Sequence, residues 1–191
     1  MYGIDVSNNN GTPKSIGRAQ FVIAKCTQGT SFVDTTYDRY AQLAEDSKAQ
    51  FGAYHYFIAG SMNARSQATF FVRHARPRSF LSLWVDYEVY GVNGASDASE
   101  LGLFISTVKL AYPKQKVGIY ANETGLQRIQ PHLAEIPYDA IWLAAWSIPA
   151  SQQVPGLPRW NIHQYAISPS QVDQDYTDWS ESQMQEFFTW G

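Results

Sequence analysis

The sequence is poor in cysteine, in charge and in long apolar runs. Cys26 is the only cysteine among 191 residues, so no disulfide can form within the chain and the fold depends on packing. Charged residues make up 16% of the chain, below the usual ~25%. The net charge of -3 argues against a nucleic-acid binder. Since no apolar run approaches the ~20 residues of a membrane span, we expect no membrane insertion.

Aromatic side chains are abundant instead. Six Trp, twelve Tyr and ten Phe bring the aromatic fraction to 15%, and hydrophobic residues reach 45%. Intrinsic disorder is excluded, because it requires few aromatics and many charges. The length predicts a single domain over residues 1–191. We expect the Pro-rich segment 148–158 to be a surface loop within that domain.

Short apolar runs alternate with helical patterns along the chain. Helices are predicted over 35–50, 62–74, 97–110 and 180–188 from apolar residues at spacings of three and four. In the third of these, Asp97 and Glu100 resemble a capping box at its start. Runs rich in Val, Ile, Phe, Tyr and Trp predict strands over 2–7, 21–27, 51–58, 81–88, 116–122, 140–146 and 160–166.

This alternation is typical of right-handed parallel βαβ units. A doubly wound sheet would favour a G-x-G-x-x-G turn after the first strand, and residues 5–11 lack it. From residue 140 onwards the helical patterns fade while strands continue. We therefore predict a compact TIM-like β/α barrel whose last third is irregular.

Acidic residues fall at the ends of predicted strands, where β/α barrels carry their working residues. Asp86 and Glu88 are two apart, so they project to the same face, with Cα atoms roughly 6.6 Å apart. Two carboxylates in an aromatic cleft suit glycoside hydrolysis, in which one acts as an acid and the other stabilises the sugar cation. Alternatively, Asp86 and Glu88 lie in a surface hairpin or an ion pair, and Asp5 caps a turn.

An ordered set of motifs resembles glycoside hydrolase family 25, the Chalaropsis-type lysozymes and phage endolysins. The resemblance covers nearly the whole chain. The motifs are, in order, Gly3-Ile4-Asp5-Val6-Ser7, the run 21–30, Gly52-Ala53-Tyr54-His55-Tyr56, Ala64 with Gln67, Ala68 and Phe71, Asp86-Tyr87-Glu88, Gly118-Ile119-Tyr120, Trp142-Leu143-Ala144, Gln164-Tyr165 and Val172-Asp173.

The resemblance implies an irregular (β/α)5(β)3 barrel and a muramidase, which cleaves the β-1,4 bond between N-acetylmuramic acid and N-acetylglucosamine in peptidoglycan. By resemblance, Glu88 is the general acid/base and Asp86 assists at the anomeric carbon. Asp5 and Asp173 match two further family acids with tuning and positioning roles. Retention with assistance by the substrate N-acetyl group is the favoured outcome, and direct carboxylate attack is the rival.

Aromatic residues on the same strands are candidates for binding sugar rings. Strand alternation gives each ring one of two positions, the barrel lumen or the core beneath the helices. We expect the lumen for most of them and assign substrate binding to Tyr54, Tyr56, Tyr120, Trp142, Trp146 and Gln164.

The four histidines form no metal-ligand spacing, and we expect no metal and no cofactor. Two alternatives to a muramidase remain. One is a non-catalytic cell-wall glycan-binding barrel, and the other is a metal-dependent deacetylase or phosphodiesterase barrel. We expect a monomer without a separate wall-binding domain. The first residues lack the basic and apolar regions of a secretory signal, so we expect release by a phage holin or carriage by a virion.

Overall fold

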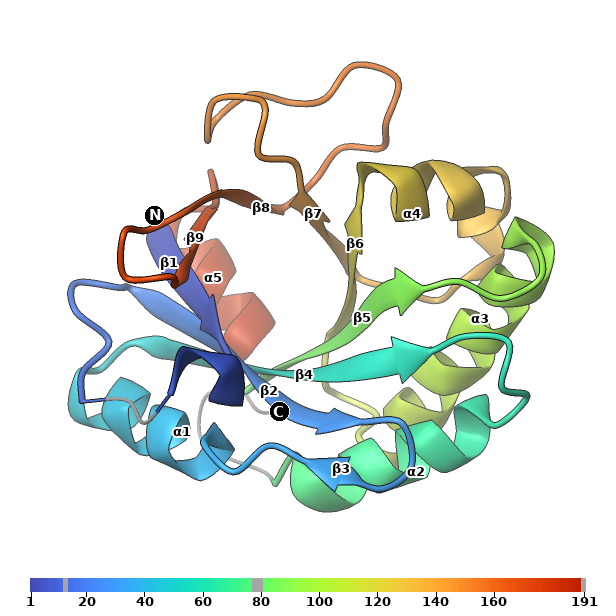
Figure 1. The fold of residues 1–191 in the computed structure, drawn as a ribbon, viewed down its shortest axis with the longest axis horizontal. Coiled ribbons are helices and arrows are strands. Elements are labelled where there is room, and N and C mark those ends of the chain that lie inside the picture. The colour runs from blue at the N-terminus through green and yellow to red at the C-terminus, as the bar shows by residue number, and fades with distance from the viewer. Residues whose placement is uncertain (12–13, 77–80, 190–191) are drawn as a thin grey trace.

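Eight strands close into a barrel that is viewed down its axis in Figure 1. The structure is a computed structural model that describes residues 1–11, 14–76 and 81–189. Around the barrel the strand order is β1-β9-β8-β7-β6-β5-β4-β2, and the β1–β2 pairing closes the ring. The strands of the ring are β1 (Tyr2–Val6), β2 (Phe21–Gln28), β4 (Gln50–Ile58), β5 (Ser82–Val89), β6 (Val117–Asn122), β7 (Ala140–Ala144), β8 (Ile162–Ile167) and β9 (Asp173–Tyr176), and β3 (Phe32–Val33) pairs with β2 outside it.

Most of the barrel is parallel, and β9 runs antiparallel to both of its neighbours, β1 and β8. In chain order, the first five strands of the ring, β1, β2, β4, β5 and β6, are each followed by helical structure. Loops follow β7 and β8. The predicted (β/α)5(β)3 barrel is therefore confirmed, with only a 3-10 turn after β1. The helical elements are η1 (Asn8–Asn10), α1 (Tyr37–Asp46), α2 (Ala64–His74), α3 (Gly94–Ala111), α4 (Glu123–Ile129), η2 (Gln130–Glu135) and α5 (Glu181–Phe188).

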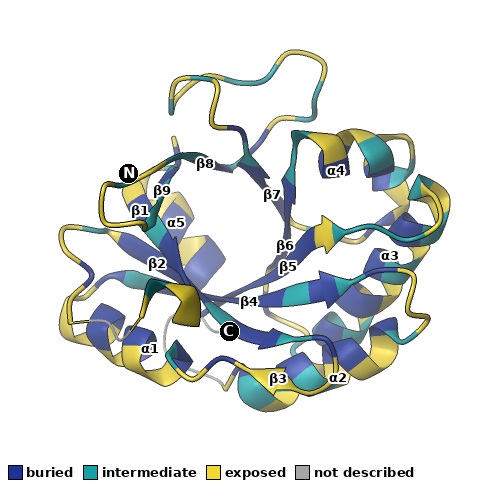
Figure 2. Cartoon of the chain, viewed as in Figure 1, coloured by how far each residue is buried: buried dark blue, intermediate teal, exposed yellow. Residues whose placement is uncertain are grey.

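Strand alternation divides the core into two layers. On β5, Leu83 and Val85 face outward and pack under the helices, while Trp84 belongs to a separate cluster inside the barrel. Helix α5 closes the inner layer at the base, because its Met184 and Phe188 pack in that same cluster. Figure 2 shows the resulting dark ring of buried strands, with α5 seen through it. The inner layer stops below the carboxyl ends of the strands, which leaves that end open.

Helix α3 starts earlier than predicted. Its N-cap is Asn93, whose side chain accepts a hydrogen bond from the Ser96 backbone N–H at 2.9 Å. The predicted capping box is wrong, because Asp97 is fully buried and Glu100 accepts from the Gly60 backbone N–H. Strands β3 and β9 and helix α4 were not predicted. Within the described residues, no helix combines the length and the apolar character that crossing a membrane requires.

Candidate active site

A cleft of about 410 Å³ opens at the carboxyl ends of the barrel strands. This volume falls within the ~300–1,000 Å³ typical of ligand pockets. Its lining includes all ten residues singled out from the sequence: Asp5, Tyr54, Tyr56, Asp86, Glu88, Tyr120, Trp142, Trp146, Gln164 and Asp173. Seven different strands and the loop after β7 supply these side chains, so the closed barrel is what brings them together.

Asp86 and Glu88 lie at different depths on the inner face of β5. Asp86 is 5% exposed, and its Oδ1 atom is buried without a hydrogen-bond partner among the described residues. Glu88 is exposed at the mouth of the cleft. Burial, and then the charge of Glu88, raise the pKa of Asp86 well above its usual range. Partial desolvation at the mouth also raises the pKa of Glu88. The pair therefore retains a proton more readily than two isolated carboxyls would.

Lys25 supplies positive charge beside this pair. Its ammonium group donates to Gln28 Oε1 at 2.7 Å and lies 4.6 Å from the centre of the Tyr56 ring. The charge of Lys25 lowers the pKa of both Asp86 and Glu88, opposing the effect of burial. Burial in turn lowers the pKa of Lys25 itself. Lys25 thus limits how far the two carboxyl pKa values can rise.

Gln164 connects two sides of the cleft. Its Oε1 accepts from the Tyr120 hydroxyl at 3.1 Å and from the Trp146 indole N–H at 3.0 Å. Its Nε2 donates to Asp5 Oδ2 at 2.8 Å. The Tyr120 hydroxyl also reaches Glu88, where its hydrogen bond lowers the pKa of that carboxyl. Since the hydroxyl has a single proton, it donates to one of these two acceptors at a time.

Three aspartates gather where β9 meets β1. Asp5 pairs in register with Asp173, and Asp175 is opposite Gly3. Asp175 is fully buried and hydrogen-bonds to Asp5. Burial raises the pKa of Asp5, of Asp173 and of Asp175. This corner of the cleft therefore combines carboxyls that burial and mutual repulsion keep from all being ionised at once.

The aromatic residues of the cleft divide by depth. Trp142 is 1% exposed and contacts Tyr54, Trp84 and Tyr120 edge-on, so it forms the floor. Trp146, just after β7, is 57% exposed and stands at the rim. The floor rings complete the barrel interior, whereas the rim ring offers an apolar face to a ligand.

Sequence reasoning missed two residues of this region, Asp175 and Lys25. A signal existed for each. Asp175 is two residues after Asp173, so the two share a face once 173–176 is recognised as a strand. Lys25 interrupts the apolar strand β2 near its carboxyl end, where a charged side chain is rarely buried without a role.

Among the described residues, no group of three or more His, Cys, Asp or Glu side chains could hold a metal ion. His55 is fully buried and hydrogen-bonds to Thr27 and Gln67, in contact with the rings of Phe71 and Phe104. Burial lowers the pKa of His55 to about 3. His55 is therefore a neutral part of the core and lies outside the cleft.

A barrel that presents two carboxyls of different depth in an aromatic-lined cleft has the arrangement of a glycoside hydrolase. The comparison with protein families agrees. The model of glycosyl hydrolases family 25 matches residues 4–174, and the chain belongs to this family.

Solved structures share the fold at low sequence identity. A family 25 glycosyl hydrolase from Bacillus anthracis has a TM-score of 0.85 at 20% identity, covering 99% of this chain and 94% of that one. The lysozyme from Streptomyces coelicolor has a TM-score of 0.84 at 20% identity, covering 98% and 96%. The catalytic domain of the endolysin ply40 from bacteriophage P40 of Listeria monocytogenes has a TM-score of 0.75 at 21% identity, covering 98% and 96%. No curated protein matches the sequence.

Proposed function

We propose that the chain is a muramidase that cleaves the β-1,4 bond between N-acetylmuramic acid and N-acetylglucosamine in peptidoglycan. The observation that carries this proposal is the unpartnered Oδ1 atom of Asp86, deep in the cleft beside Glu88. A buried carboxylate oxygen without a donor is costly, by about 1–3 kcal/mol. The N–H of a 2-acetamido group is a donor of suitable size and polarity for that position.

Substrate binding distributes the proton between the two carboxyls. In the free enzyme the proton favours Asp86, whose pKa burial raises most strongly. A hydrogen bond from the acetamido N–H favours the charged form of Asp86 and lowers its pKa. The proton is then held by Glu88, which is exposed at the mouth and can reach the glycosidic oxygen. Glu88 thus becomes the general acid when substrate is present.

The reaction proceeds in two steps. Glu88 gives its proton to the glycosidic oxygen as the bond to the anomeric carbon breaks, and the acetamido oxygen bonds to that carbon. Asp86 stabilises the positive charge of the resulting oxazolinium. The Glu88 carboxylate then takes a proton from water, whose oxygen attacks the anomeric carbon. The bond from that carbon to the acetamido oxygen breaks, which opens the oxazolinium ring and restores the acetamido group. Two inversions leave the configuration retained.

The remaining lining residues bind and orient the glycan. We assign the apolar sugar faces to Tyr56 and Trp146, which stand nearer the mouth, and the floor of the site to Tyr54, Tyr120 and Trp142. Gln164 holds Tyr120 and Trp146 in place through its Oε1 atom. Asp5 and Asp173 tune the charge of the site without touching the leaving group.

Two substitutions test these roles directly. Glu88→Gln and Asp86→Asn keep the size of each side chain, so both variants should fold, with circular dichroism as the check. We expect each to clear purified cell walls at least ~100-fold more slowly than wild type, the range lost with a general acid. Glu45→Gln, on the exposed side of α1, is the matched control and should clear walls at the wild-type rate. Undiminished clearance by Glu88→Gln contradicts the proposal.

The biological setting is a further part of the proposal. We propose wall lysis in the manner of a phage endolysin, supported by the fold shared with the endolysin ply40 domain. We also propose that the chain acts as a monomer, because one chain supplies the whole lining of the cleft. Lysis of host cells only when a holin is co-expressed would support the endolysin role. Sedimentation at the mass of one chain would support the monomeric state.

A further inference from the structure

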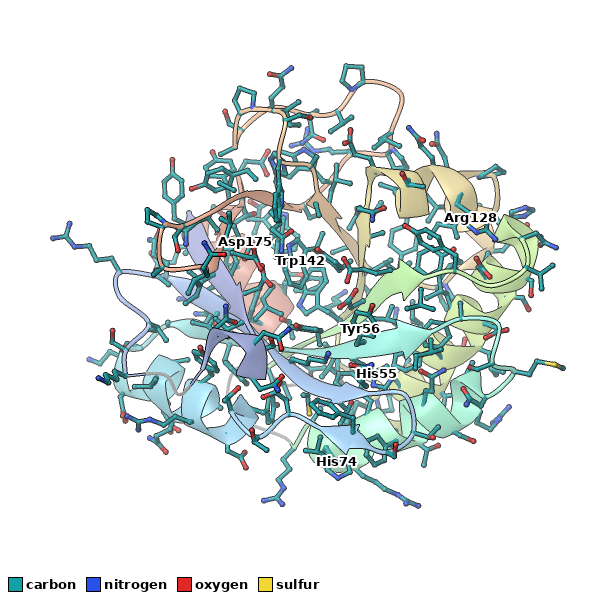
Figure 3. All side chains as sticks on the ribbon, viewed as in Figure 1. His55, Tyr56, His74, Arg128, Trp142 and Asp175 are labelled. Atoms are coloured by element: carbon teal, nitrogen blue, oxygen red, sulfur yellow. The ribbon has the colours of Figure 1, made fainter. Side chains whose placement is uncertain are left out.

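Asp175 is a buried titratable group that the proposed reaction leaves unused. It is fully buried on β9, and its Oδ1 accepts a hydrogen bond from the Trp142 indole N–H at 2.8 Å. Figure 3 shows the two side chains together inside the barrel. The other oxygen, Oδ2, accepts no hydrogen bond from an N–H or hydroxyl group of the described residues. The remaining partner of Asp175 is another carboxyl, that of Asp5. Two carboxyls can share a hydrogen bond only when one of them carries a proton.

The surroundings decide which carboxyl carries the proton. Tyr120 and Trp146 both donate to Gln164 Oε1, which fixes the amide so that its Nε2 donates to Asp5. Each carboxyl thus has one donor that favours its ionised form, Gln164 Nε2 at Asp5 and Trp142 Nε1 at Asp175, but the second oxygen of Asp175, Oδ2, is buried and accepts from no described residue. The hydrogen bond between the two carboxyls raises the pKa of Asp175 and lowers that of Asp5. The proton belongs on Asp175.

The other groups that face this pair disfavour a second negative charge. Asp173 on β9, Tyr120 on β6 and Tyr165 on β8 face Asp175, and Glu88 and Asp86 on β5 face Asp5. Every one of these groups is an acid. A charge on both Asp5 and Asp175 would therefore be opposed by burial and by each of its neighbours.

We propose that Asp175 is a positioning residue that stays protonated and donates to Asp5, so that Asp5 Oδ2 remains an acceptor for the Gln164 amide. Through Gln164 this bond holds Tyr120 beside Glu88 and Trp146 at the rim. It also limits the Asp5–Asp175 pair to at most one negative charge, which favours ionisation of Asp86 when substrate arrives. The proposal rests on the muramidase function only in these consequences for catalysis.

Two variants and a control test it. Asp175→Asn offers an amide N–H to Asp5 and an oxygen to Trp142, but cannot titrate, whereas Asp175→Ala removes both bonds. Asp175→Asn should retain kcat within about threefold of wild type, and Asp175→Ala should lose at least about tenfold. The control, Asp46→Asn, removes one exposed carboxylate from the end of α1 and should leave kcat unchanged.

The pH dependence of unfolding tests the proton without any need for activity. A carboxyl whose pKa is raised by folding gives stability that is complete below its unfolded pKa, about 4, and is lost as pH rises towards the folded pKa. The ratio of the unfolding constants of wild type and Asp175→Asn should therefore rise by up to about tenfold per pH unit above pH ~4. This rise should exceed any seen with Asp46→Asn, which removes an exposed carboxyl.

Each contrary result has its own meaning. A ratio that does not change with pH shows Asp175 ionised in the folded protein and overturns the proposal, whether or not the enzyme cleaves peptidoglycan. Loss of kcat in a folded Asp175→Asn as large as in Asp175→Ala also overturns it, because the position would then need more than a donor. If Asp175→Ala does not fold, the comparison of wild type with Asp175→Asn still decides. Failure of wild type to cleave peptidoglycan refutes the proposed function alone.

Discussion

Replacing Trp142 with Phe should destabilise the protein markedly. The change removes the indole N–H that donates to Asp175 Oδ1 at 2.8 Å, at a site where Trp142 is 1% exposed. Leaving that buried acceptor without a partner costs about 1–3 kcal/mol. The lost part of the ring corresponds to one or two buried methylene groups, or about 1–2 kcal/mol. The free energy of unfolding should fall by ~2–5 kcal/mol, a large part of the ~5–15 kcal/mol typical of a domain.

The assay is urea denaturation followed by circular dichroism in the far ultraviolet, which reports on the helices and does not depend on tryptophan fluorescence. Trp146→Phe is the matched control, because it also removes an indole N–H that donates to a side-chain oxygen, that of Gln164. Trp146, however, lies at the rim and is 57% exposed. Its free energy of unfolding should change by less than ~0.5 kcal/mol. Equal effects of the two substitutions would refute the reasoning, since burial would then not determine the cost.

Two further predictions concern activity. Lys25→Met removes the cation that lowers the pKa of Glu88, so the pKa of Glu88 should rise and the alkaline limb of the kcat/KM profile should move to higher pH. An unmoved alkaline limb, measured with soluble glycan fragments, would show that Lys25 does not act on Glu88. Trp146→Ala removes the exposed ring at the rim, so KM should rise by about threefold to tenfold while unfolding is nearly unchanged; a fall in kcat alone would contradict a binding role.

Much of the fold could be predicted because its periodic segments are buried on one side. Leu101, Phe104, Ile105 and Val108 follow helical spacing and are all fully buried in α3. The predicted start of that helix is wrong, because Asp97 resembles a capping residue in the sequence. Its actual partners are the Tyr87 hydroxyl at 2.5 Å and the Arg128 guanidinium at 2.8 Å. Arg128 is 31 residues further along the chain, so local pattern alone could not reveal this contact.

The missed elements lack a local signal of their own. Strand β9 reads Asp-Gln-Asp-Tyr, and it exists because β1 and β8 pair with it on both sides. Helix α4 is seven residues long and contains Gly125, although Asn122 caps it through the Gly125 backbone N–H at 2.8 Å. The candidate site could be predicted from motifs at the ends of strands. Asp175 could not, because the strand that carries it, β9, was not predicted. Tertiary pairing supplied what propensity could not.

The central claim is that the cleft around Asp86 and Glu88 cleaves peptidoglycan on the muramic acid side of its disaccharide repeat. Digestion of purified peptidoglycan, followed by borohydride reduction and analysis of the new reducing ends, tests it most directly. We predict reduced N-acetylmuramic acid in the wild-type digest and none above background with Glu88→Gln. New ends of N-acetylglucosamine, or no new ends at all, would contradict the account.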